Sequence, residues 1–224
     1  MNRSSPLYTI RILVAAIVMG LCQNAGAVTV LLDAAWVRAG FGSVGDRCLD
    51  DVLLDLKPGD RFALIIPTLG RSATLSPLVG FTTHRRPSVH TAELIATRRL
   101  LNRILATADP SHWPSLAQIL AQLAASAYPA NPQDNRYVII GALTATDPPT
   151  VDLALQQLLH GRRVTIVDLA PSGSKLYDTR LKAWRNFFAA TGTVQPDILP
   201  LSALSTSKPR TSVCSGHRLQ ILDH

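Results

Sequence analysis

Apolar residues recur along the chain in short continuous runs and in stretches with helical spacing. The continuous runs, which are typical of strands buried on both faces of a sheet, lie at residues 28–33, 61–66, 137–143, 163–169 and 198–201. A weaker pattern at residues 75–82, interrupted by proline and glycine, predicts a short edge strand or hairpin. The runs therefore predict that one sheet organises most of the chain.

Apolar residues spaced three or four positions apart predict helices between these strands. The helical stretches lie at residues 47–56, 91–106, 116–127, 148–160 and 174–190. Ser115 is a candidate N-cap, and Asp147 followed by Pro148 is a second, in a helix that Gly161 ends. Because strands and helices alternate, we predict an α/β fold: a mostly parallel sheet with helices on both faces in a three-layer sandwich.

The first 27 residues are typical of a secretory signal. Arg3 and Arg11 give a positively charged segment before an apolar run at residues 12–21, and Ala25-Gly26-Ala27 has the small residues of a cleavage site. This run is too short to span a membrane, so we expect cleavage after Ala27 and no stable membrane span afterwards. An uncleaved anchor and a lipoprotein signal at Cys22 are the alternatives.

The expected organisation follows from this leader. Residues 1–27 form the signal peptide, residues 28–201 the α/β domain, and residues 202–224 a tail rich in serine, threonine and proline. We expect a periplasmic location in a bacterium, with secretion from the cell as the alternative.

Charge and composition exclude several functions. The 22 basic and 15 acidic residues give a net charge of +7, but the paired arginines are dispersed and not interleaved with aromatic residues, so no nucleic-acid partner is expected. Glu93 is the single glutamate, which excludes an HExxH zinc site and a glutamate-pair glycosidase.

Two cysteines remain after the leader, Cys48 and Cys214. An oxidising compartment permits a disulfide between them. It would pin the C-terminal tail to the start of the domain, and we predict this pairing over two free thiols.

In a parallel sheet the loops after the strand carboxyl ends gather at one edge, where α/β proteins bind their ligands. We call the loops at residues 33–45, 67–72, 142–147 and 168–174 the rim. A partner-binding surface is predicted there, formed by Trp36, Arg38, Phe41, Arg71 and Asp147. Two alternatives stay open for the aromatic residues: they fold inward as a lid on the sheet, or they anchor a partner.

Several stretches resemble von Willebrand factor A-type domains. The closest is LDLKPGDRFALII at residues 54–66, which is similar to the phrase between the family's first helix and second strand. VTVLLDAAW at 28–36 is similar to its first strand, and YVIIGALTATD at 137–147 and RVTIVDLAP at 163–171 are similar to its fourth and fifth. The resemblance covers most of the chain after the leader and implies the same three-layer fold.

The metal-dependent adhesion site of that family uses a D-x-S-x-S motif at the end of the first strand, because hard cations prefer oxygen ligands. Asp33 keeps the aspartate, but Ala35 and Val37 occupy the hydroxyl positions. We therefore expect a degenerate, metal-free site without a cofactor, in which Asp33 accepts hydrogen bonds from loop amides.

The loop Gly40–Gly45 spells G-x-G-x-x-G, a pattern typical of dinucleotide binding. The first glycine lies well past the strand, and the next strand ends without the acidic residue that would bind a ribose. We therefore interpret it as a rim loop.

The resemblance implies a non-catalytic module, since most A-type domains bind other proteins. We expect a protein-binding or envelope-assembly module in the periplasm, with conjugative or secretion machinery as one setting. The alternative is a secreted α/β enzyme, a hydrolase or nucleotide binder, that uses the Gly40–Gly45 loop.

Overall fold

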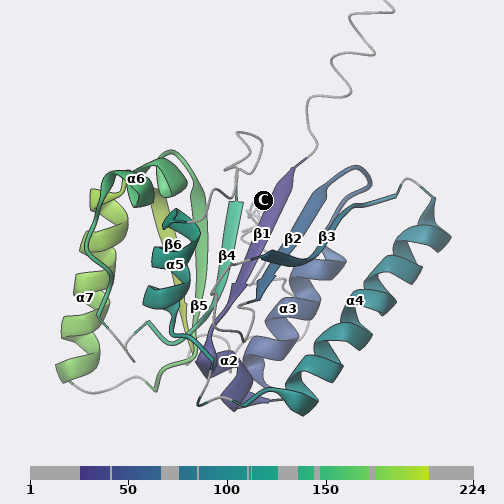
Figure 1. Ribbon diagram of the computed structural model, residues 1–224, viewed down its shortest axis with the longest axis horizontal. Coiled ribbons are helices and arrows are strands. Elements are labelled where there is room, and N and C mark those ends of the chain that lie inside the picture. Colours follow the sequence, from purple (N-terminus) through teal and green to yellow (C-terminus); the bar gives the residue numbers. More distant parts are fainter. Residues whose placement is uncertain are drawn as a thin grey trace, which may run out of the picture.

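The computed structural model describes residues 26–40, 42–66, 76–84, 86–109, 111, 113–125, 136–143, 147–171 and 175–201. Their strands form one sheet in the order β3-β2-β1-β4-β5-β6 (Figure 1). The strands are β1 (Ala27–Leu32), β2 (Arg61–Ile66), β3 (Ser76–Thr82), β4 (Arg136–Gly141), β5 (Arg163–Asp168) and β6 (Val194–Pro200). Neighbouring strands run parallel except β2 and β3, which are antiparallel. The predicted mostly parallel α/β sheet is therefore confirmed.

Helices cover both faces of this sheet. They are α2 (Ala34–Ala39), α3 (Val44–Leu54), α4 (Pro87–Thr107), α5 (Leu116–Ala125), α6 (Leu153–Leu159) and α7 (Lys175–Ala190). One core cluster joins the sheet to α2, α3 and α4, and a second joins it to α5, α6 and α7. The two clusters define the three layers.

The central strand β1 shows why a continuous apolar run forms this sheet. All six of its residues are buried, because a helical layer covers each face. Val28, Val30 and Leu32 face the first cluster, whereas Leu31 faces the second. This is the two-residue alternation of a strand.

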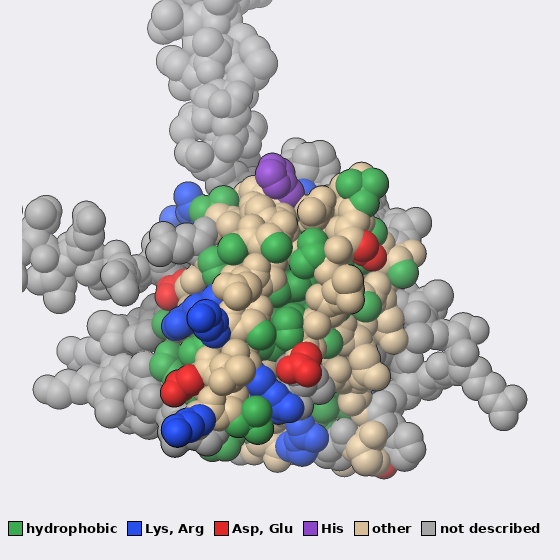
Figure 2. Space-filling model, turned by 90° about the vertical axis from the view of Figure 1, so that its left-hand side faces the viewer, with side chains coloured by type: hydrophobic (Ala, Val, Ile, Leu, Met, Phe, Trp, Pro, Cys, Tyr) green, Lys and Arg blue, Asp and Glu red, His purple; other side chains and the backbone are tan. Residues whose placement is uncertain are grey.

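The side of the molecule that carries α7 faces the viewer in Figure 2. Lysine and arginine side chains gather mainly in its lower half, with hydrophobic side chains between them. Among the described residues, no helix combines the length and the apolar character needed to cross a bilayer.

Ser115 caps its helix as predicted. The Ser115 amide donates to Gln118 Oε1 at 2.8 Å, and the Gln118 amide donates to Ser115 Oγ at 3.4 Å. This reciprocal pair is a capping box, which satisfies amides that the first helical turn leaves free.

The predicted N-cap at Asp147 is wrong. The fourth predicted helix is shorter, because α6 begins at Leu153 and is capped by Asp152, which accepts from the Leu155 amide at 2.8 Å. Two successive prolines explain the difference: a residue before proline is disfavoured in the helical region, and Pro148 precedes Pro149.

Candidate functional site

The carboxyl ends of β1, β4 and β5 meet at the edge of the sheet beside α2 (Figure 1). The chain leaves β1 towards β2 on one side, while β4 lies on the other side. The strand order therefore reverses between β1 and β4, and this reversal point is where open α/β sheets bind ligands.

Asp33 follows β1 at this point and is buried. Its Oδ1 accepts from the amides of Ala35 at 2.7 Å and Trp36 at 3.3 Å, which makes it the N-cap of α2. Its Oδ2 accepts from the Ala142 amide, after β4, at 2.9 Å. Asp33 is thus an acceptor for loop amides, as the sequence predicted, and it joins the ends of two neighbouring strands.

Gly141, the last residue of β4, makes room for this carboxylate. A Cβ at position 141 would lie 2.4 Å from Asp33 Cγ and 2.5 and 2.7 Å from its two oxygens. These separations are shorter than van der Waals contact allows, so only glycine fits here while Asp33 holds the Ala142 amide.

Asp168, the last residue of β5, is a second buried carboxylate at this edge. Its Oδ1 accepts from the amides of Leu143 at 3.2 Å and Ala170 at 3.1 Å, and its Oδ2 accepts from the Tyr177 hydroxyl at 3.1 Å. The consecutive amides of Ala142 and Leu143 are therefore held by carboxylates from the strands on either side of β4.

Burial dominates the electrostatics of these groups. It raises the pKa of Asp33 and of Asp168 above the usual value, although the hydrogen bonds to each carboxylate oppose the shift. Burial, together with the charge and hydrogen bond of Asp168, raises the pKa of Tyr177 to about 12. Tyr177 therefore stays a hydrogen-bond donor at neutral pH, and both carboxylates have structural partners.

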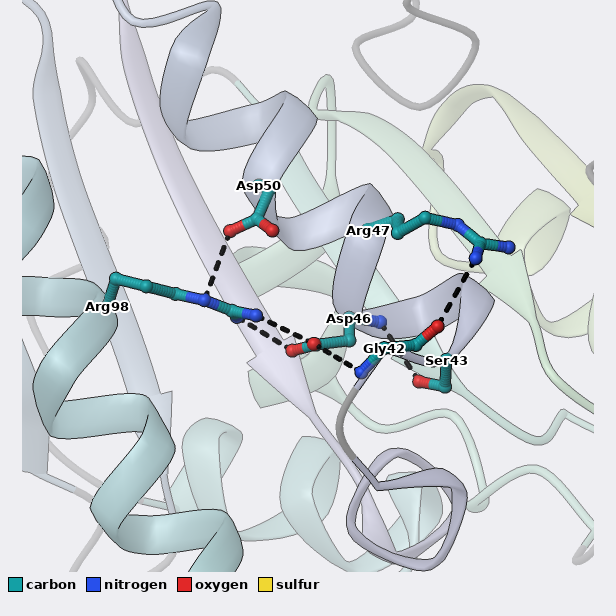
Figure 3. A network of polar contacts seen from close by, with 6 residues as sticks. All are labelled: Gly42, Ser43, Asp46, Arg47, Asp50 and Arg98. Carbon is teal, nitrogen blue, oxygen red and sulfur yellow. Dashed lines mark hydrogen bonds and ion pairs between the residues drawn. The ribbon is translucent and has the colours of Figure 1, made fainter. Parts of the chain in front are cut away.

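A second polar network fixes the loop that leads into α3 (Figure 3). Arg98 on α4 donates from both terminal nitrogens to the two Asp46 oxygens at 2.7 Å. The Gly42 amide also donates to Asp46 Oδ2 at 2.9 Å, and Arg98 Nε lies 3.3 Å from Asp50 Oδ1. This forked ion pair fastens α4 to the start of α3.

Burial by itself would raise the pKa of Asp46. The hydrogen bonds from Arg98 and Gly42 and the charges of Arg98 and Arg47 outweigh that effect, so the pKa is lowered. Arg47 also donates to the Gly42 carbonyl oxygen at 3.2 Å (Figure 3), and the Ser43 hydroxyl accepts from the Asp46 amide at 3.2 Å. The loop is thus held by its own residues.

The glycines of the Gly40–Gly45 loop have conformational and packing roles. Gly40 and Gly42 have φ of +71° and +68°, which favour glycine. A Cβ on Gly45 would lie 3.0 Å from Ile140 and 3.1 Å from Leu169, so the start of α3 packs closely on the strand ends. The predicted rim loop at 33–45 also contains a helix, α2, between β1 and these glycines.

The structure separates the residues predicted for the partner-binding surface. Trp36 is fully buried in the first core cluster. Of the two alternatives, Trp36 therefore folds inward as a lid on the sheet. Arg38 and Asp147 are exposed, and Asp147 Oδ1 lies 3.7 Å from Arg180 Nε. Phe41 and Arg71 lie outside the described residues.

At the two positions predicted to have lost their hydroxyl ligands, Ala35 is half-buried and packs against a small cluster of Ala142, Ala170 and Tyr177, while Val37 is part of the core. Neither side chain carries a ligand oxygen. Among the described residues, no three His, Cys, Asp or Glu side chains lie together as metal ligands would.

Cys48 is buried on α3 and is disulfide-bonded. Its partner lies outside the described residues, as do Cys22 and Cys214. The pairing of Cys48 with Cys214 therefore stays a prediction.

The sequence did not predict the structural roles of Asp168 and Gly141 or the ion pair of Asp46 with Arg98. Asp168 and Gly141 lie near the ends of the apolar runs at residues 163–169 and 137–143, so their place near strand ends was an available signal. The pairing of Asp46 with Arg98 links positions 52 residues apart, and no local pattern indicates it.

No protein-family model and no curated protein sequence matches the chain.

Proposed function

We propose that the chain is a non-catalytic protein-binding module of the bacterial envelope, exported by its leader and built on an A-type-like fold without a metal site. Its setting is an envelope assembly such as conjugative or secretion machinery. The proposal rests on the resemblance of residues 28–36, 54–66, 137–147 and 163–171 to A-type domains, and the alternation of strands and helices supports it.

The single observation that carries the proposal is that Asp33 and Asp168 act as structural hydrogen-bond acceptors. Their positions at the strand ends are those from which carboxylates act on ligands in α/β proteins. Here every carboxylate oxygen of the two residues accepts from a main-chain amide or from Tyr177. They organise the rim, and recognition falls to the side chains exposed around it.

Exposed side chains at this edge form a candidate contact surface. Ala35 on α2 packs against the small apolar cluster of Ala142, Ala170 and Tyr177, so α2 and α7 both contribute to this cluster at the rim. Next to Tyr177, Leu176 is 59% exposed, and Arg180 lies one helical turn further along α7. We call Arg38, Leu176 and Arg180 the rim surface; Arg38 and Leu176 are exposed, and Arg180 is half-buried beside Asp147.

An acidic and partly apolar protein surface is the complement of the rim surface. Arginine donates two parallel hydrogen bonds to a carboxylate, and an exposed leucine flanked by cations adds apolar area to the interface. We therefore expect binding that weakens as salt rises, because part of it is electrostatic.

The test compares two exposed leucines near the starts of two helices, Leu176 on α7 and Leu153 on α6. Leu176→Asp alters the rim surface, whereas Leu153→Asp alters a leucine that is 68% exposed at the start of α6. The tagged full-length protein is purified with its partners from envelope extract, and partners are identified by mass spectrometry. Leu176→Asp should lose partners that the wild type and Leu153→Asp retain, with unchanged melting temperatures. Equal recovery by all three proteins would contradict the proposal.

A further inference from the structure

Gly26 and Ala27, the last two residues of the predicted leader, belong to the folded domain. Ala27 is the first residue of β1, pairs with Arg61 and is 1% exposed. The Arg61 amide donates to the Gly26 carbonyl oxygen at 2.9 Å, which continues the β1–β2 ladder to residue 26.

The Asp60 carboxylate accepts a hydrogen bond from the main-chain nitrogen of Gly26. Asp60 is 9% exposed, and its Oδ1 accepts from the Gly26 amide at 2.9 Å. Oδ2 accepts from the Lys57 amide at 2.8 Å, and the Asp60 carbonyl oxygen accepts from the Thr83 amide at 2.8 Å. Asp60 therefore ties the start of β1 to the turn before β2.

Cleavage after Ala27 conflicts with this arrangement. It would remove the donor to Asp60 Oδ1 and the acceptor for the Arg61 amide, and it would shorten the central strand. A buried carboxylate oxygen without its donor is costly, because the desolvation of the group is no longer compensated.

We propose that the native protein retains Gly26, that Asp60 is the binding site for its main-chain nitrogen, and that the leader is cut on the amino side of Gly26 or kept. Two sources supply this nitrogen. A cut after Ala25 makes it an α-ammonium group, whose bond to Asp60 becomes a charge-assisted ion pair. A retained leader leaves it an amide, with the geometry described above.

Intact mass and N-terminal sequencing of the native protein, expressed from its full gene and purified from the envelope, test the proposal. A chain that begins with Gly26 supports it and identifies the ammonium source. A chain with a longer N-terminus supports it and identifies the amide source. A folded protein that begins with Ala27 or Val28 overturns it.

A second measurement addresses Asp60 itself in the same full-length gene. Asp60→Asn keeps one acceptor oxygen and loses the other, whereas Asp197→Asn removes the same charge at an exposed position of β6. Asp60→Asn should lower the melting temperature by about 4 °C or more, and Asp197→Asn should leave it within about 1 °C. Asp60→Asn should also speed hydrogen exchange of the residue 26–28 amides. An exchange rate there that is unchanged from the wild type would overturn the assignment.

Discussion

Replacing Gly141 with alanine places a methyl group where the Asp33 carboxylate lies. The added Cβ would be 2.4 Å from Asp33 Cγ, and both residues are buried, so the carboxylate has to move. Asp33 accepts three main-chain hydrogen bonds. Losing these, at about 1 kcal/mol each, and overpacking the site, at about 1–3 kcal/mol, predicts a loss of roughly 4–6 kcal/mol in the free energy of unfolding.

Urea unfolding followed by tryptophan fluorescence measures this loss, because Trp36, Trp113 and Trp184 are buried. Gly80→Ala is the matched control, since Gly80 also lies in a strand and its nearest atom to an added Cβ is 3.9 Å away. We expect Gly80→Ala to change stability by less than about 1 kcal/mol.

Asp33→Ser provides a background that separates the steric effect from other causes. Serine keeps an N-cap oxygen but lacks the carboxylate that the added methyl group would meet. In this background, Gly141→Ala should cost at least about 2 kcal/mol less than in the wild type. An equal cost in both backgrounds, or a cost below about 1 kcal/mol in the wild type, would refute the assigned role of Gly141.

Four further outcomes are expected. Arg98→Met should destabilise the protein by about 3 kcal/mol, because Asp46 is left buried without its partner. Because the folded-state pKa of Asp46 lies below 3.8, its stabilisation is present at neutral pH and is lost as pH falls through that pKa. Arg98→Met should weaken this acid dependence in thermal unfolding. Trp36→Ala should cost about 3 kcal/mol or more by urea unfolding, as expected for a buried lid. If Cys48 pairs with Cys214, non-reducing peptide mapping recovers that link, and reduction removes about 4–5 kcal/mol of loop-closure stabilisation. A link from Cys48 to Cys22 would contradict the pairing. Millimolar Mg²⁺ should leave the melting temperature unchanged, and a shift abolished by Asp33→Ala would contradict the degenerate site.

The fold follows largely from local patterns in the sequence. Continuous runs such as that of β1 indicate burial on both faces, and alternation with helices indicates parallel strands. The Ser115 cap was also predictable, because its partner Gln118 is three residues away. These signals act over a few residues, so the sequence displays them directly.

Local patterns also misled where several residues compete for one role. Asp147 has the form of an N-cap, but two successive prolines carry the chain past it to Asp152. The loop after β1 contains no strong helical pattern, yet Asp33 caps a short helix there and turns Trp36 into the core.

Whether these carboxylates bind a ligand or support the main chain depends on contacts between elements that are distant in the sequence. In the sequence, Asp33 ends one apolar run, and Asp168 and Gly141 lie near the ends of two others. Only the parallel order of β1, β4 and β5 brings the three together, so that each carboxylate holds an amide after β4. The same holds for Arg98 with Asp46 and for Gly26 with Asp60. Each pair depends on the distance between elements far apart in the chain, and that distance is set by packing rather than by any local preference of the residues.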